Sequence, residues 1–186
     1  MKQAPGPDDA QTRYTRTAIL LHWLIAAAIL GQIMLGWYVD DIPRNTPARA
    51  WWVNLHKSIG LTIGLLIVLR LAWRWLHRPP ELPPFMPGWE RASARLSHWA
   101  LYACMLIMPL SGYIASNFSK WGVKFFNAVP LPPWGVDDKH IYAIFNGTHV
   151  VTSYIFVALI AVHVIGALRH AVRRDGVVRR MWPAQR

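Results

Sequence analysis

The sequence predicts an all-α fold, a membrane four-helix bundle with both chain termini on the cytoplasmic side. Its 186 residues are 54% hydrophobic and include 11 Trp, whereas only 16% are charged. This composition is typical of membrane proteins rather than of soluble domains. Four separate apolar segments are each long enough to cross a bilayer, which takes about 20 helical residues. Basic residues are shared unequally between the loops that join these segments, and this asymmetry orients the bundle.

The four expected spans follow one another along the chain. The first covers about residues 17–39, and the second covers about residues 51–76. The third covers about residues 93–116. Pro109 inside it is expected to kink the helix, a defect that neighbouring helices can absorb. The fourth, about residues 141–172, is longer than a bilayer requires and is expected to project from it.

One domain accounts for the chain. Residues 1–16 form a polar N-terminal tail, residues 17–172 hold the four-helix transmembrane unit, and residues 173–186 form a basic cytoplasmic tail. The N-terminal tail is not expected to be a signal peptide, because the apolar segment after it is too long and lacks a small-residue cleavage site. The single cysteine, Cys104, lies inside an apolar segment. Neither a disulfide framework nor a cysteine-based metal site is therefore expected.

Charge placement sets the orientation. Of the 20 Lys and Arg residues, 14 lie in the two tails, the end of the second span and the 77–95 loop, and six lie in the other two loops and the start of the second span. Because cytoplasmic loops carry the excess of Lys and Arg, both termini are expected in the cytoplasm. This placement accounts for the net charge of +11. The expected partner is therefore membrane lipid, and nucleic-acid binding is not expected.

Four histidines inside the apolar segments form two pairs by depth. His22 and His163 lie in the cytoplasmic halves of the first and fourth spans, and His56 and His149 lie in the periplasmic halves of the second and fourth. A membrane-buried histidine is unfavourable unless its ring nitrogens are occupied. A b-type haem held by two histidines needs one neutral imidazole on each face, and its apolar macrocycle fits between helices. The pairs therefore predict two haem sites, an electron path through the membrane.

Other interpretations of these histidines stay open. A single intramembrane histidine often bonds to a neighbouring helix, but four at matched depths favour haem. A zinc site is disfavoured, because the fourteen-residue spacing of His149 and His163 separates the pairs by about 21 Å of helix. A proton relay usually recruits Asp or Glu, and no acidic residue lies deep within a span.

Several further side chains are candidates for the same sites. His98 in the third span and His170 near the end of the fourth could each bond a haem propionate or a quinone carbonyl, or be ordinary interfacial histidines. Arg70, inside the second span, needs a propionate, a quinone head group or a route to the interface. Lys57 beside His56 could favour the approach of a small anion. Glycines within the spans could admit a porphyrin or reflect ordinary helix packing; they are Gly31, Gly36, Gly60, Gly64 and Gly112.

Four motifs occur in order along the chain. They are LHW at 21–23, NLHKSIG at 54–60, RLSHWALY at 95–102 with MPLSGY at 108–113, and the two histidines of the fourth span. Together they resemble the bacterial cytochrome b561 family, small four-helix di-haem proteins of the inner membrane, over about residues 13–182. The resemblance implies two haem b groups held by the pairs that depth suggests, and a quinone site near the cytoplasmic haem. The chain departs from many relatives at Val150, where they have Glu, and at Arg169, where they have His.

The resemblance also implies what the protein does. One activity of the family is that of a superoxide:ubiquinone oxidoreductase, in which superoxide gives up its electron on the periplasmic side and ubiquinone accepts it. An enzyme of the bacterial inner membrane is therefore expected. One alternative is a quinol-linked cytochrome b that exchanges electrons with a periplasmic redox protein. Such a partner could dock on the 117–140 loop, which could equally cover the periplasmic haem. A haem-free membrane scaffold or transporter is an alternative of another class.

Overall fold

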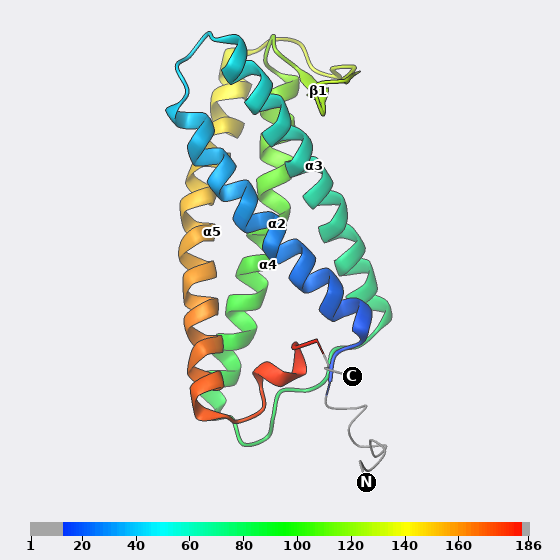
Figure 1. The fold of residues 1–186 in the computed structure, drawn as a ribbon, viewed down its shortest axis with the longest axis vertical. Coiled ribbons are helices and arrows are strands. Elements are labelled where there is room, and N and C mark those ends of the chain that lie inside the picture. The colour runs from blue at the N-terminus through cyan, green and yellow to red at the C-terminus, as the bar shows by residue number, and fades with distance from the viewer. Residues whose placement is uncertain (1–12, 184–186) are drawn as a thin grey trace.

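The computed structural model describes residues 13–183 and is a bundle of four long helices (Figure 1). These helices are α2 (Arg16–Asp41), α3 (Pro47–Leu76), α4 (Gly88–Asn117) and α5 (Lys139–Arg173). Each is long and apolar enough to cross a membrane. The predicted membrane four-helix bundle is therefore confirmed. Both ends of the described chain lie at the same end of the bundle, which the charge distribution assigns to the cytoplasm.

Capping residues decide where three of the helices begin. Thr15, Thr46 and Asp138 precede α2, α3 and α5, and a side-chain oxygen of each accepts a hydrogen bond from a backbone N–H in the first turn. Such a cap satisfies N–H groups that a helix start leaves without partners. These three helices consequently begin one to four residues before the predicted spans do. α4 continues through Pro109 as a single helix.

Close packing joins α2 to α3, α3 to α4, and α4 to α5. Ile25 of α2 packs against Ile63 and Ile67 of α3 to form the most buried apolar cluster. Among the long helices, α5 packs closely only on α4 within residues 13–183. An apolar groove of about 290 Å³ lies between α2 and α5, and it is lined by Leu30, Ile33, Met34, Trp37, Val157 and Ile160. The bundle is therefore open along α5 on the side that faces α2.

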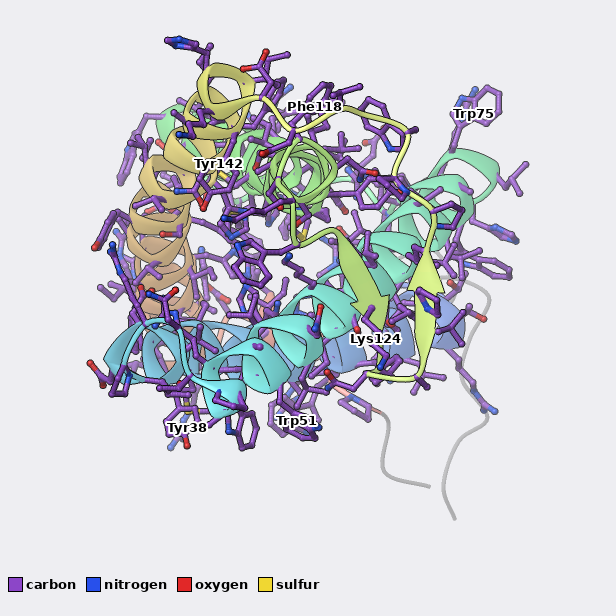
Figure 2. The ribbon with its side chains drawn as sticks, turned by 90° about the horizontal axis from the view of Figure 1, so that it is seen from above. Tyr38, Trp51, Trp75, Phe118, Lys124 and Tyr142 are labelled. Atoms are coloured by element: carbon purple, nitrogen blue, oxygen red, sulfur yellow. The ribbon has the colours of Figure 1, made fainter. Side chains whose placement is uncertain are left out.

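The loop of residues 117–140 contains a β-hairpin that the sequence does not predict. Strand β1 (Val123–Phe125) pairs antiparallel with β2 (Val129–Leu131). Phe126 and Asn127 between them have positive φ angles of 46° and 57°, which suits the tight turn of a hairpin. Figure 2 shows the hairpin from above, with Lys124 on the strand that contacts α3. This short hairpin is the one correction to an all-α fold in the described chain.

After α5 the chain turns back and packs against the start of α2. Its last element is a single 3-10 turn, η1 (Val178–Arg180). The indole N–H of Trp23 donates a hydrogen bond to the Met181 carbonyl at 2.8 Å. The Arg13 guanidinium donates to the carbonyls of Arg179 and Trp182 at 3.3 and 3.1 Å. Residues 174–183 of the expected C-terminal tail are thus folded onto the bundle, whereas residues 1–12 and 184–186 of the two tails lie outside the described residues.

Candidate functional site

The structure brings together both histidine pairs that the sequence predicts. The ring centroids of His22 on α2 and His163 on α5 are 6.4 Å apart. Those of His56 on α3 and His149 on α5 are 6.2 Å apart. In each pair one histidine lies on α5 and the other lies on α2 or α3, and α5 does not pack closely on either of these helices. The two pairs therefore lie in the more open part of the bundle.

The spacing within each pair fits a metal ion between the rings. A metal–imidazole bond is about 2 Å long, so two rings that bind one metal from opposite sides have centroids about 6 Å apart. The observed separations of 6.4 and 6.2 Å agree with this value. Among residues 13–183 no group of three or more His, Cys, Asp or Glu side chains is close enough to hold a metal ion. Each pair therefore offers two imidazole donors, a set that suits a b-type haem iron.

One ring nitrogen of His149 is already used by α4. Its Nδ1 lies 2.9 Å from the Met108 carbonyl oxygen and 3.5 Å from the Ser111 hydroxyl. A carbonyl oxygen can only accept, so Nδ1 carries the hydrogen and Nε2 keeps a free lone pair. Metal-binding histidines usually donate their second N–H to a carbonyl or carboxylate, which fixes the tautomer and the ring orientation. Nε2 of His149 is therefore free to bind a metal ion.

Two glycines position the rings of the periplasmic pair. A Cβ added to Gly36 of α2 would lie 3.3 Å from Cε1 of His56, and one added to Gly112 of α4 would lie 3.1 Å from Nδ1 of His149. Both distances are shorter than ordinary van der Waals contact, so a side chain at either position would displace a ring. The sequence predicts that these glycines admit a porphyrin or pack helices. In the structure they admit the imidazoles themselves.

Gln32 is a site residue that the sequence does not reveal. Its side-chain amide donates a hydrogen bond to the backbone carbonyl of His56 at 2.7 Å, which ties α2 to α3 at the depth of the periplasmic pair. Gly60 leaves room for this contact, because a Cβ there would lie 3.2 Å from the amide nitrogen. A side-chain amide in an otherwise apolar span is the signal that could have identified it.

His98 and Arg70 lie beside the cytoplasmic pair. The ring centroid of His98 on α4 is 5.5 Å from that of His163. The guanidinium of Arg70 on α3 lies within electrostatic range of the rings of His22, His98 and His163. Its Nη1 is buried and has no hydrogen-bond partner among the described residues. A buried guanidinium nitrogen strongly favours an acceptor, so this corner of the bundle suits an anionic group.

The ring of His170 is hydrogen-bonded to a residue that follows it closely in the sequence. Its Nδ1 lies 2.6 Å from a carboxylate oxygen of Asp175. Partial burial alone would raise the pKa of Asp175. The hydrogen bonds from His170 and the Val177 N–H, together with the charges of His170 and Arg173, instead lower this pKa below its ordinary value. One ring nitrogen of His170 is therefore occupied, and contact with a quinone would have to use the other.

Polar groups of α3 anchor the hairpin. The half-buried ammonium of Lys57 donates a hydrogen bond to the Gly122 carbonyl at 2.7 Å. The hydroxyl of Ser58, which is fully buried, accepts one from the backbone N–H of Phe126 at 2.7 Å. The role of Lys57 in anion approach stays a prediction, because the contact that the structure shows for its ammonium is structural.

We expect Ser58→Ala to loosen the hairpin without unfolding the bundle. The substitution leaves the partly buried N–H of Phe126 without its partner, which costs about 1–3 kcal/mol. Amide hydrogen exchange at Phe126 should accelerate by about tenfold or more. Thr62→Ala is a matched control, because the one hydrogen bond of the Thr62 hydroxyl among residues 13–183 is to the Ser58 carbonyl, within α3. Equal protection of Phe126 in the two variants would contradict the anchoring role of Ser58.

An ion-pair cluster joins α4 to α5 at the cytoplasmic end. The side chain of Glu90 in the first turn of α4 is only 6% exposed. Its Oε1 lies 2.9 Å from a guanidinium nitrogen of Arg169 and 3.3 Å from one of Arg173. The sequence does not reveal this cluster, because Glu90 precedes the predicted third span and is separated from its partners by 79 and 83 positions. Arg169 therefore has a structural partner.

The chain is similar to known cytochromes over nearly its whole length. The family model described as prokaryotic cytochrome b561 matches residues 13–184. Cytochrome b561 homolog 2 of Escherichia coli strain K12 is 31% identical over 178 residues, which cover 91% of this chain and 90% of that protein. Cytochrome b562 of Cereibacter sphaeroides is 28% identical over 186 residues, covering 97% and 98%. Probable superoxide oxidase CybB of Yersinia pestis is 21% identical over 177 residues, covering 94% and 98%.

Proposed function

Because this chain belongs to the prokaryotic cytochrome b561 family, and is thus a multi-pass electron-transfer protein of the bacterial inner membrane that binds haem b, we propose that it passes electrons from periplasmic superoxide to ubiquinone through two haem b groups. Two superoxide ions would each lose one electron and become O₂. One ubiquinone would take up both electrons and two protons to become ubiquinol. The observation that carries this proposal is the pair of imidazole separations, 6.4 and 6.2 Å.

Four histidines would hold the two haem groups. His22 and His163 would hold the cytoplasmic one, and His56 and His149 the periplasmic one. When bound, haem b supplies an iron atom that gains and loses one electron. The protein would hold the imidazole rings in place and leave the lone pair of one ring nitrogen free to bind the iron. The Met108 carbonyl does this for His149, and the Gln32 amide fixes the backbone of His56.

Apolar and cationic groups of the bundle suit the rest of the cofactor. The groove between α2 and α5 has an apolar lining, which favours an apolar macrocycle. Arg70 has an unpartnered buried nitrogen near the cytoplasmic pair, so it would bind a propionate through charge-assisted hydrogen bonds. His98 and His170 would border the ubiquinone site beside that haem. His170 with Asp175 stands at the cytoplasmic end, where the protons for ubiquinol would enter.

The choice of superoxide as electron donor rests on two observations. The relative from Yersinia pestis that covers 94% of this chain bears the name of a probable superoxide oxidase. Exposed lysines lie on the periplasmic loops, among them Lys124 of β1 (Figure 2) and Lys120 before it. Their charge would raise the local concentration of a small anion. Arg49 adds little to this field, because it pairs with Asp40 at 3.7 Å.

A second candidate function has one observation in its favour. The hairpin loop exposes large apolar side chains, with Trp121 72%, Trp134 58% and Val136 82% exposed. Exposed apolar patches often mark protein interfaces. A periplasmic redox protein could dock there and exchange electrons with the periplasmic haem, in which case the chain would be a quinol-linked cytochrome b.

Superoxide added to the oxidised, haem-loaded protein distinguishes the two candidates. We expect the b-type α band of reduced haem to rise within the mixing time, and to fall again when ubiquinone is present. One ubiquinol should form for every two superoxide ions consumed, and superoxide dismutase should abolish both effects. If superoxide leaves the haem oxidised whereas ubiquinol reduces it, the superoxide proposal fails and the quinol-linked cytochrome is favoured.

A further inference from the structure

A cleft of about 480 Å³ opens at the cytoplasmic end of the bundle, between the start of α2, the end of α3 and α4. Four arginines line it: Arg13, Arg70, Arg74 and Arg78. We propose that this arginine cleft binds the phosphate of an anionic membrane lipid. The proposal does not depend on the electron donor or acceptor of the protein.

The arginine cleft holds an excess of positive charge, and none of its arginines forms an ion pair among residues 13–183. Glu81 is the one acidic residue in its lining. Among residues 13–183 the carboxylates that form ion pairs within 4.0 Å do so with Arg49, Arg169, His170 and Arg173, and none of these lines the cleft. Gathered guanidinium groups repel one another, so they favour an anion that binds several of them at once.

The contacts that the arginines of the cleft make with neighbouring groups do not neutralise their charge, so the guanidinium groups can still bind an anion. Within the described part of the chain, the Arg13 guanidinium donates only to main-chain carbonyls. The guanidinium of Arg74 lies 5.6 Å from the ring centroid of Tyr102, which holds it by a cation–π contact. Arg78 is exposed and forms no hydrogen bond or ion pair within residues 13–183. Arg70, which the proposed function assigns to a propionate, lies deepest. The outer three groups remain for a separate ligand.

The arginine cleft lies at the depth of lipid headgroups. α2 begins at Arg16 and α3 ends at Leu76, so the cleft is level with the ends of two membrane-spanning helices. Trp73 in its wall donates its indole N–H to the Thr15 hydroxyl at 2.9 Å and stacks on His77. Tryptophans near the ends of membrane-spanning helices are typical of the membrane–water interface.

Lipid-facing side chains beside the arginine cleft favour a lipid over a soluble anion. Leu20 of α2 and Leu69 and Trp75 of α3 are 67%, 51% and 87% exposed. Exposed apolar groups on a spanning helix lie against acyl chains. A lipid with its phosphate among the arginines could therefore lay its chains along α2 and α3. Basic pockets on the cytoplasmic side of membrane proteins recognise anionic headgroups by this combination of contacts.

Native mass spectrometry of the full-length, haem-loaded protein in an uncharged detergent tests the proposal. We expect one phosphatidylglycerol molecule to bind in preference to phosphatidylcholine and to inorganic phosphate. Arg74→Gln/Arg78→Gln should weaken phosphatidylglycerol binding by about tenfold or more, because each arginine near the headgroup contributes to the attraction. Arg78→Gln alone should weaken it severalfold, and this variant carries the test if the double variant does not fold.

Arg16→Gln/Arg95→Gln is the matched control, because both arginines are exposed at the same end of the bundle and neither lines the arginine cleft. It removes the same charge and should change binding by less than about twofold. An equal loss of binding in the two double variants would show a general effect of surface charge and overturn the proposal. Equal binding of phosphatidylcholine would overturn it as well, and tight binding of inorganic phosphate would replace the lipid with a soluble anion.

Discussion

His22→Ala and His56→Ala are each expected to lower the haem content of the purified protein by about half, and the two together to about zero. Each substitution removes one imidazole from one pair and leaves the other pair intact, with its centroids at 6.2 or 6.4 Å. The substitution removes one of the two histidines that would hold that haem, and we expect the remaining histidine to be too weak a hold to keep the haem bound through purification. The measurement is the dithionite-reduced spectrum, normalised to protein.

Two control variants make this experiment decisive. His140→Ala changes an exposed histidine at the start of α5 and should keep the full haem content. His98→Ala tests a different pairing, because the ring centroid of His98 lies closer to that of His163 than the centroid of His22 does, at 5.5 Å against 6.4 Å. If His98→Ala lost half of the haem whereas His22→Ala kept it, the cytoplasmic pair would be wrongly assigned. Loss of all haem in each single variant would indicate one shared site.

Arg169→Ala/Arg173→Ala is expected to lower the free energy of unfolding by about 3 kcal/mol. The side chain of Glu90 is 6% exposed and both of its partners would be removed. A buried carboxylate without a partner is strongly destabilising. This holds even where the intact ion pair contributes little net stability. Thermal unfolding of the haem-loaded protein, followed by circular dichroism in detergent, measures the change.

Adding Glu90→Gln to this double variant should restore most of the lost stability. The amide carries no charge, so its burial beside the missing arginines costs less than that of the carboxylate. Glu90→Gln alone should have a milder effect, because Arg169 and Arg173 are 43% and 49% exposed and can reach water or headgroups. Arg91→Ala/Arg95→Ala, which removes two arginines of the same end of the bundle, should change stability little. A triple variant as unstable as the double variant would contradict the role of Glu90.

The spans and the depth of each histidine follow from the sequence because both depend on distance along one axis. A helix rises about 1.5 Å per residue, so a position within a span gives a position within the bilayer. This reasoning places His22 level with His163 and His56 level with His149, and the structure brings these rings together. It does not say which side of a helix faces which neighbour, so the closeness of His98 to His163 could not be predicted.

The remaining features depend on contacts between distant segments. The hairpin is short, and its place is fixed by a buried hydroxyl on α3, Ser58, that accepts from Phe126. The target of Gln32 is a backbone carbonyl of another helix, which no side-chain pattern records. The caps that extend the helices beyond their apolar segments are local, however, and Thr15, Thr46 and Asp138 could have been recognised from the residue types that favour helix starts.

α5 provides one histidine of each proposed haem site, and it is the last long helix to be made. A ribosome releases α2 with His22 and α3 with His56 well before it releases α5 with both partners. Neither site can therefore be complete before α5 has been synthesised, and both become complete when α5 enters the membrane and packs on α4. Haem loading would then mark chains in which α5 is in place, and a truncated chain that lacks α5 would bind no haem in either leaflet.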